Sequence, residues 1–178
     1  MIILETENLI LYPLTMEFCT QNYVDWLNDI EVYKYLETRG QQNLQTLENF
    51  IQKQMDEKTN IWAIVIKETN KHIGNIKIDQ INHNHGYAEF SILIGDKNEW
   101  GKSYASEASR KVINYFFNEY LLLRKINLGV VISNIKATKL YEKIGFQTEG
   151  VFKNHLLIDG NYYDSIRMAI FNPKFKYE

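Results

Sequence analysis

Cysteine and proline are scarce in this sequence. Cys19 is the single cysteine, so the chain cannot form an internal disulfide, and a reducing compartment is expected. The two prolines, Pro13 and Pro173, stand near the ends, and no stretch rich in glycine, serine or proline interrupts the middle. These absences exclude a disulfide-stapled secreted scaffold and predict a single domain over residues 1–178.

Long apolar runs and targeting signals are missing as well. No run approaches the ~18 consecutive apolar residues of a membrane-spanning helix. The first residues, MIILETENLILYPL, contain no basic side chain and include Glu5 and Glu7, unlike a secretory signal peptide. We therefore expect a soluble, cytoplasmic protein without membrane partners.

Charge of the two signs nearly balances but is unevenly placed. The chain has 20 Lys and Arg against 22 Asp and Glu, and a sequence pI near 6.1 argues against a nucleic-acid-binding function. Residues 1–60 carry a net charge of −6, whereas residues 97–143, with 9 basic and 4 acidic side chains, carry +5. The basic stretch suits an anionic ligand, but before any motif is considered a solvated surface explains it better.

The spacing of apolar residues predicts a mixed α/β domain. Strands are expected at residues 2–12, 61–67, 72–81, 87–94, 125–132, 147–158 and 162–171. Helices are expected after Thr15, at residues 29–37, at 43–58, after Gly95 and at 135–144, the last with Asn134 as N-cap and Gly145 as its C-terminal stop.

One segment, ILIGDKNEWGKSYASEA at residues 92–108, has the composition of an anion-binding loop. A strand ends, a polar loop with two glycines follows, and a helix begins, so unpaired backbone N–H groups and the positive end of the helix dipole are presented. Small residues at Gly101, Ser103 and Ala105 leave room for a diphosphate, and Lys102 adds a positive charge. A nucleotide P-loop is not expected, because Asp96 stands where that pattern needs its first glycine.

This loop resembles the acyl-CoA pyrophosphate loop of the GNAT acetyltransferase superfamily, whose pattern is Q/R-x-x-G-x-G/A. The match runs from Trp100 to Ala105, with Trp100 in place of Gln or Arg and Ser103 in place of the central glycine. A second segment, SNIKATKLYEKIGF from Ser133 to Phe146, is similar to the other GNAT hallmark, N-x-x-A-x-x-x-Y-E-K-x-G-F. The expected element order is also that of GNAT proteins. Both ends of the chain look like the branch with ribosomal-protein (Rim-type) and amino-sugar N-acetyltransferases.

The resemblance implies a GNAT fold, a splayed mixed β-sheet flanked by helices, and acetyl-CoA as the donor with CoA as product. In GNAT enzymes the amine attacks the thioester directly, and pantetheine lies between two separating parallel strands, here 87–94 and 125–132. A backbone N–H near Leu93 to Gly95 would stabilise the thioester oxygen. The implied cofactor-binding residues are Leu93, Ile94, Trp100, Gly101, Lys102, Ser103, Tyr104, Ala105, Asn134 and Tyr141.

Two residues are the candidates for catalysis. The resemblance implies that the phenol of Tyr141 protonates the leaving thiolate; the helical spacing alone fits a core tyrosine as well. Glu89, between apolar neighbours in the strand 87–94, is the candidate base for the acceptor ammonium, because only the neutral amine is a nucleophile. A salt-bridged or solvated Glu89, and a water relay in its place, stay open.

The acceptor candidates come mostly from the acidic N-terminal part. Trp26, Tyr33, Tyr35 and Arg39 form an aromatic-plus-Arg group that would hold a sugar or nucleotide, unless these rings only pack the helices. His155, on a C-terminal strand, is a further candidate. No metal site is expected, because the H-x-H pair in the turn at residues 82–86 lacks a third ligand.

We therefore expect an N-acetyltransferase acting on a primary amine of a small molecule, with a nucleotide-linked amino sugar as one example. A protein N-terminal amine, as in the Rim-type enzymes, is the alternative acceptor. A non-catalytic acyl-CoA-binding module is the alternative of another class, and the presence of both Tyr141 and Glu89 argues against it. A monomer and a homodimer both stay open.

Overall fold

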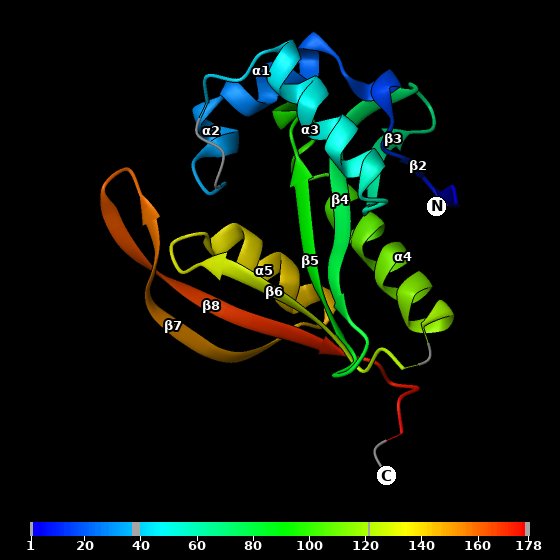
Figure 1. Ribbon diagram of the computed structural model, residues 1–178, viewed down its shortest axis with the longest axis vertical. Coiled ribbons are helices and arrows are strands. Elements are labelled where there is room, and N and C mark those ends of the chain that lie inside the picture. Colours follow the sequence, from blue (N-terminus) through cyan, green and yellow to red (C-terminus); the bar gives the residue numbers. More distant parts are fainter. Residues whose placement is uncertain (1, 37–39, 121, 177–178) are drawn as a thin grey trace. The chain divides into compact units, whose positions relative to one another are not determined.

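The computed structural model describes residues 2–36, 40–120 and 122–176. Its N-terminal part contains β1 (Leu4–Glu5), β2 (Leu9–Pro13), the short 3-10 helix η1 (Met16–Phe18), α1 (Gln21–Asn28), α2 (Ile30–Tyr33) and α3 (Leu44–Asp56). The middle contains β3 (Asn60–Ile66), β4 (Lys71–Asn82), β5 (Tyr87–Ile94), η2 (Lys97–Glu99) and α4 (Tyr104–Glu119). The C-terminal part contains β6 (Lys125–Val131), α5 (Ile135–Ile144), β7 (Gln147–Ile158) and β8 (Asn161–Phe171) (Figure 1).

The strands form a mixed sheet in the order β1-β2-β3-β4-β5-β6-β8-β7, which confirms the expected α/β class. β5 and β6 pair in parallel from Tyr87↔Lys125 to Glu89↔Asn127. β1 with β2, β2 with β3, β3 with β4, β6 with β8 and β7 with β8 pair antiparallel. The described parallel ladder therefore ends at Glu89, partway along β5.

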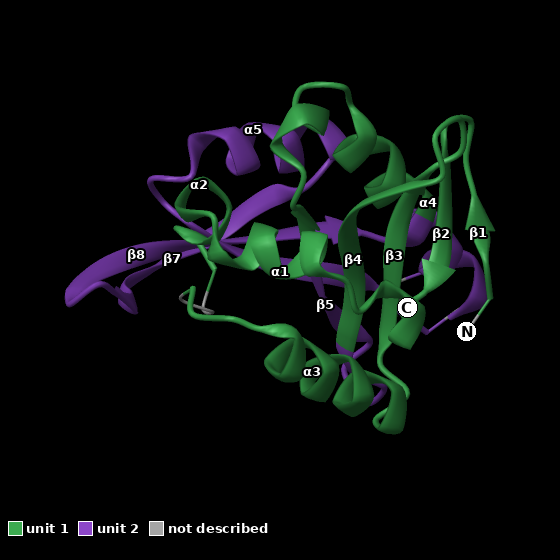
Figure 2. Cartoon of the chain, turned by 90° about the horizontal axis from the view of Figure 1, so that it is seen from above, with its two compact units in different colours: residues 1–79, 91–111 green, residues 80–90, 112–178 purple. Residues whose placement is uncertain are grey.

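The described residues fall into two compact units. Unit 1 comprises Met1–Asp79 and Ser91–Lys111, and unit 2 comprises Gln80–Phe90 and Val112–Glu178 (Figure 2). The strands β4 and β5 and the helix α4 each pass from one unit into the other, so the chain alternates between them. Each unit is therefore described by itself.

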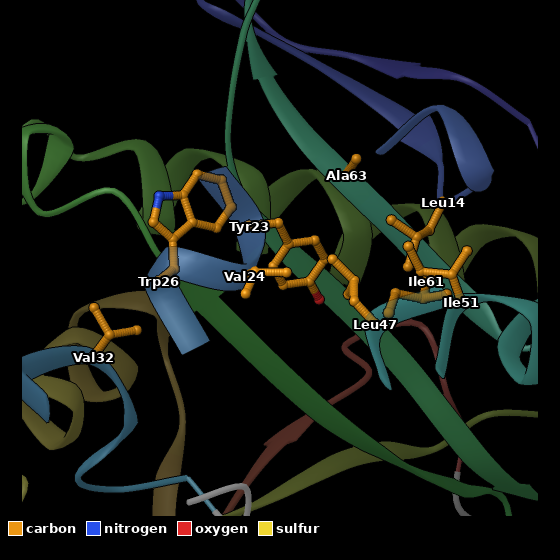
Figure 3. Close-up of a cluster of buried hydrophobic side chains, with 9 residues drawn as sticks. All are labelled: Leu14, Tyr23, Val24, Trp26, Val32, Leu47, Ile51, Ile61 and Ala63. Atoms are coloured by element: carbon orange, nitrogen blue, oxygen red, sulfur yellow. The ribbon is translucent and has the colours of Figure 1, made fainter. Parts of the chain in front are cut away.

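The core of unit 1 is built by α1, α2 and α3 against β3. Figure 3 shows the nine buried side chains of this cluster: Leu14, Tyr23, Val24, Trp26, Val32, Leu47, Ile51, Ile61 and Ala63. α3 begins in a capping box, in which the Asn43 side chain accepts from the Thr46 N–H and the Thr46 side chain accepts from the Asn43 N–H. The apolar i, i+3, i+4 spacing of residues 43–58 thus forms the helix that it predicts.

In unit 2, α5 packs its apolar face on the sheet. The Phe90 ring of β5 meets the rings of Tyr141 and Phe146 edge-on or tilted, at centroid distances of 6.1 and 5.7 Å. Asn134 caps the helix through its side-chain oxygen, and Gly145 ends it with a φ of +121°, as the sequence predicts. Among the described residues, no helix combines the length and apolarity needed to cross a membrane.

Three N-terminal elements differ from the expectation. The single strand expected at residues 2–12 is two antiparallel strands, because the Thr6 Oγ1 accepts from the Leu9 N–H and turns the chain between them. The helix expected after Thr15 is divided into η1, which follows Thr15 directly, and α1, which begins at Gln21 with Thr20 as its N-cap. The helix expected at residues 29–37 is the short α2, which ends at Tyr33.

Candidate active site

The loop that leaves β5 in unit 1 has the geometry of an anion-binding turn. Gly101 adopts a φ of +80°, and a Cβ there would meet no heavy atom within 4 Å, so the loop is open at this point. The sixteen-residue helix α4 follows. The Glu107 N–H donates to the Ser103 carbonyl, which is the first i to i−4 hydrogen bond at the start of this helix. The N–H groups of its first turn therefore have no partner within the helix and point to the loop. These residues fit a pyrophosphate.

Ser103, which stands in place of the pattern's central glycine, adopts a backbone conformation that favours glycine. Its φ of +66° lies in the left-handed region, where a residue with a Cβ is strained by about 1–2 kcal/mol. A glycine would adopt this conformation without that strain. The exposed Ser103 hydroxyl adds a donor at this position.

Trp100, the other departure, ties the loop to the end of its strand. Its indole Nε1 donates to the Ile94 carbonyl over 2.8 Å, while 38% of the residue stays exposed. A Gln or Arg at this position would also carry N–H donors, so tryptophan retains a donor and adds an exposed ring.

Four charged side chains next to the loop form a network: Lys71, Asp96, Glu99 and Lys102. The sequence indicated only Lys102 as a binding residue. Glu99 accepts from Lys102 at 2.8 Å and from Lys71 at 3.1 Å, and Lys71 also pairs with Asp96. The Lys102 hydrogen bond, foremost, and the Lys71 pair lower the pKa of the Glu99 carboxyl. The i, i+3 spacing of Glu99 and Lys102 was a readable signal. Nothing local indicates Lys71.

A β-bulge in β4 fixes the segment that follows β5. Ile64 pairs with Gly74 and Val65 with His72, so Ile73 is the extra residue, and its carbonyl accepts from the N–H groups of both Gly95 and Asp96. Gly74 is required there, because a Cβ would lie 2.0 Å from the Leu93 carbonyl oxygen. Since the Gly95 N–H is engaged, Leu93 and Ile94 remain as candidate donors for a thioester oxygen.

His72, beside this bulge, is enclosed by aromatic rings. Phe18, Tyr23 and Trp26 approach its imidazole at centroid distances of 4.9, 5.6 and 5.0 Å. Its Nε2 lies 2.9 Å from the Gly74 carbonyl oxygen, which only accepts, so Nε2 carries the proton. Burial lowers the pKa of His72 to about 4 and keeps the ring neutral at neutral pH.

The acceptor candidates of unit 1 lie in different surroundings. Trp26 is a core residue, and a Cβ on Gly95 would lie 2.3 Å from its indole, which explains the glycine. Tyr33 and Tyr35 are half-buried, with the Lys34 ammonium 5.6 Å from the Tyr35 ring centroid. Arg39 lies outside the described residues. Cys19 packs at the edge of the core.

Tyr141 in unit 2 has the environment of a proton donor. It is 9% exposed, and the rings of Phe90 and Phe146 flank it in edge-to-face geometry. Burial raises the pKa of its hydroxyl to about 12. The phenol therefore stays protonated at neutral pH and can donate a hydrogen bond to an anion such as a thiolate.

Glu89 is held by an arginine and is not surrounded by apolar groups alone. One guanidinium nitrogen of Arg167 donates to its two carboxylate oxygens at 2.7 and 2.9 Å, and the Asn127 amide donates at 3.4 Å. Glu89 is thus salt-bridged, which is one of the alternatives that the sequence left open. Its partner Arg167 was not predicted from the sequence. Each carboxylate oxygen still has lone pairs to accept a further proton or hydrogen bond.

The remaining candidates of unit 2 are on α5 and β7. Asn134 spends its side-chain oxygen on the Ala137 N–H at 3.3 Å, so its capping role is confirmed and its pantetheine role stays a prediction. His155 is exposed on β7 and meets the Phe152 ring at 5.1 Å.

Known proteins resemble the chain along most of its length. Residues 8–147 match the family described as "Acetyltransferase (GNAT) domain". An uncharacterized N-acetyltransferase, p20 of Bacillus licheniformis, is 29% identical over 176 residues, which are 97% of both chains. The spermidine N(1)-acetyltransferase of Vibrio cholerae is 37% identical over 112 residues, 62% of this chain and 64% of that protein.

A solved structure of the same kind shares the fold. The crystal structure of spermidine N-acetyltransferase from Vibrio cholerae in complex with CoA and spermine has a TM-score of 0.83 and 28% identity, covering 95% of this chain and 98% of that chain. The family match spans well over half of the 178 residues. The chain therefore belongs to the GNAT acetyltransferase family and is an acetyl-CoA-dependent N-acetyltransferase.

Proposed function

We propose that residues 1–178 act as one domain that transfers the acetyl group of acetyl-CoA to a primary amine of a small molecule, with a polyamine as the first candidate. The observation that carries this proposal is the likeness to the Vibrio cholerae spermidine N(1)-acetyltransferase, 37% identical over 112 residues. The net charge of −6 on residues 1–60 supports a cationic acceptor, because an acidic surface attracts polycations over several ångströms.

The cofactor end of the reaction is assigned to unit 1. Acetyl-CoA supplies the activated thioester, and the loop from Trp100 to Ala105 binds its pyrophosphate through backbone N–H groups at the start of α4. A backbone N–H of Leu93 or Ile94 serves the thioester oxygen. Support for this comes from the open backbone at Gly101 and from the engagement of the Gly95 N–H by Ile73.

The proton-handling groups are assigned to unit 2. Tyr141 holds the proton that the departing thiolate takes, and its pKa near 12 means that the hydroxyl carries this proton at neutral pH. Glu89 takes the proton of the acceptor ammonium, directly or through water. Arg167 orients its carboxylate, and the remaining lone pairs leave room for that proton.

A second candidate acceptor is an amino sugar, free or nucleotide-linked. The half-buried rings of Tyr33 and Tyr35 favour it, because sugars stack on aromatic faces in mostly apolar pockets. A protein N-terminal amine is a third candidate acceptor, and a protein that binds acyl-CoA without catalysis is a fourth possibility. One experiment distinguishes all four.

The experiment is a thiol-release assay with acetyl-CoA against a panel of amines, with product masses determined in parallel. The panel contains spermidine and spermine, free and nucleotide-linked amino sugars, and peptides with free N-termini; fully N-acetylated versions serve as matched controls. We expect one thiol per acetylated amine with the polyamines. Turnover restricted to sugars or peptides would contradict the polyamine assignment, and CoA binding without turnover on any amine would contradict catalysis.

A further inference from the structure

Two buried carboxylates lie just before the loop, Trp100 to Ala105, to which the pyrophosphate is assigned. Asp96 is 8% and Glu99 is 9% exposed, and Glu99 stands two residues before the open backbone at Gly101. A buried anion next to a polyanion's binding loop repels that ligand unless cations neutralise it. The contacts of Glu99 therefore bear directly on cofactor affinity.

Glu99 has two lysine partners, one on each carboxylate oxygen. The Lys102 ammonium lies 2.8 Å from Oε2, and the Lys71 ammonium lies 3.1 Å from Oε1. Lys71 also pairs with Asp96, so two positive and two negative charges cancel within the cluster. The one lysine of the motif, Lys102, thus has its charge already engaged by a protein carboxylate.

The two lysines differ in how easily they can be released. The Lys102 side chain is 51% exposed and is anchored only three residues from Glu99, in the loop itself. Lys71, from β4, contacts both carboxylates. If Lys102 turns to another anion, Lys71 still contacts both Glu99 and Asp96, so neither carboxylate loses its last cationic partner, while the cluster then carries one positive and two negative charges.

We propose that Glu99 sets the affinity for CoA by competing with the cofactor's pyrophosphate for Lys102. Lys102 is paired with Glu99 in the free protein and passes to the pyrophosphate on binding, while Lys71 stays with Glu99. This inference rests on the proposed role of the loop in the acetyltransferase reaction. No bond is made or broken in the exchange; only the partner of an ammonium group changes.

The proposal predicts a non-additive pair of substitutions. Glu99→Gln frees Lys102, so the Kd for CoA falls about tenfold. Lys102→Met in the wild-type background raises the Kd less than threefold, because the lost phosphate contact is offset by the carboxylate contact that no longer has to be broken. The same Lys102→Met change in the Glu99→Gln background raises the Kd tenfold or more.

The measurement is calorimetric titration with CoA, which binds without turnover, and with 3′-dephospho-CoA, which lacks the 3′-phosphate and retains the pyrophosphate. The matched control is Asp29→Asn, which removes an acidic partner of Lys97 in the same loop, leaves Lys102 alone and retains a capping side chain on α2. Its Kd should stay within twofold of the wild type. Thermal unfolding establishes that each variant is folded. Glu99→Ala takes the place of Glu99→Gln if the glutamine variant does not fold.

Several outcomes overturn the proposal. These are an unchanged Kd for Glu99→Gln, additive effects of the two substitutions, an equal gain for Asp29→Asn, or a gain that disappears with 3′-dephospho-CoA. In each of these cases turnover by the wild type with acetyl-CoA and an amine leaves the proposed function standing. Absence of CoA binding by the folded wild type would contradict both.

Discussion

The loop of unit 1 and the surroundings of Tyr141 in unit 2 control their polar groups by opposite means. In the loop, Lys71, Asp96, Glu99 and Lys102 form a network in which opposite charges neutralise one another. Tyr141 is instead buried between the aromatic rings of Phe90 and Phe146, and burial raises the pKa of its hydroxyl. Its described contacts include no ion pair. In the proposed mechanism, the first arrangement tunes how tightly an anion binds, and the second fixes where a proton stays.

This difference teaches which measurements should respond to which substitution. Changes in the charged loop should appear in binding constants, since pairing of ions governs affinity there. Changes at the proton-handling groups should appear in kcat, because proton transfer contributes to the rate and not to ground-state binding. The predictions that follow are ordered from the largest effect to the smallest.

The largest effect is expected for Glu89→Gln. Removal of the proton acceptor should lower kcat about 100-fold at neutral pH and change the acidic limb of the pH–rate profile, which reports a group that must be unprotonated. The matched control is Glu149→Gln, which also loses a basic partner, Lys125, in unit 2 and should keep its rate within twofold. An unchanged kcat with an acidic limb of unchanged shape would exclude Glu89 as the base.

Gly74→Ala should destabilise unit 1 by about 3 kcal/mol, because its Cβ would overlap the Leu93 carbonyl oxygen. Denaturation by urea measures the free energy of unfolding. Gly150→Ala is the control, since a Cβ there meets nothing within 4 Å, and its effect should stay below about 0.5 kcal/mol. Equal midpoints for the two variants would mean that the bulge at Ile73 does not constrain the end of β5.

The buried His72 should make the protein less stable on mild acidification. Burial holds its pKa near 4 in the folded chain, below the ordinary value of 6.5, so between these values the unfolded chain binds a proton that the folded chain does not. The free energy of unfolding should therefore fall by about 1 kcal/mol from pH 7 to pH 5.5. His72→Phe should remove this fall, and the exposed His83→Phe should retain it. The same pH dependence in all three proteins would contradict the prediction.

These cases show what local sequence can and cannot predict. Asn134 and Gly145 were readable because a cap and a stop depend on neighbouring residues. The pairs Lys71–Glu99 and Arg167–Glu89 join residues 28 and 78 positions apart, so no spacing rule indicates them. The bulge at Ile73 was also hidden, because the apolar pattern of β4 does not show where an extra residue enters the ladder.

The smallest effect is expected for Ser103→Gly. Glycine relieves the strain of the positive φ but loses more chain entropy on folding, so the free energy of unfolding should rise by about 0.5–1 kcal/mol. Ser91→Gly, within β5, is the control and should change it in the opposite direction, since glycine weakens a strand. Thermal unfolding of both variants measures this, and a loss of stability in both would mean that Ser103 is not strained.

The most direct test of the account measures kcat and the Kd for CoA side by side in two variants. Tyr141→Phe keeps the ring that packs on Phe90 and removes only the hydroxyl, so kcat should fall about 100-fold while the Kd stays within twofold. Glu99→Gln should do the reverse, with a Kd about tenfold lower and kcat within twofold of the wild type. An unchanged kcat for Tyr141→Phe, or a fall in kcat matched by an equal weakening of CoA binding, would contradict the assignment of proton donation to Tyr141 and affinity to the charged loop.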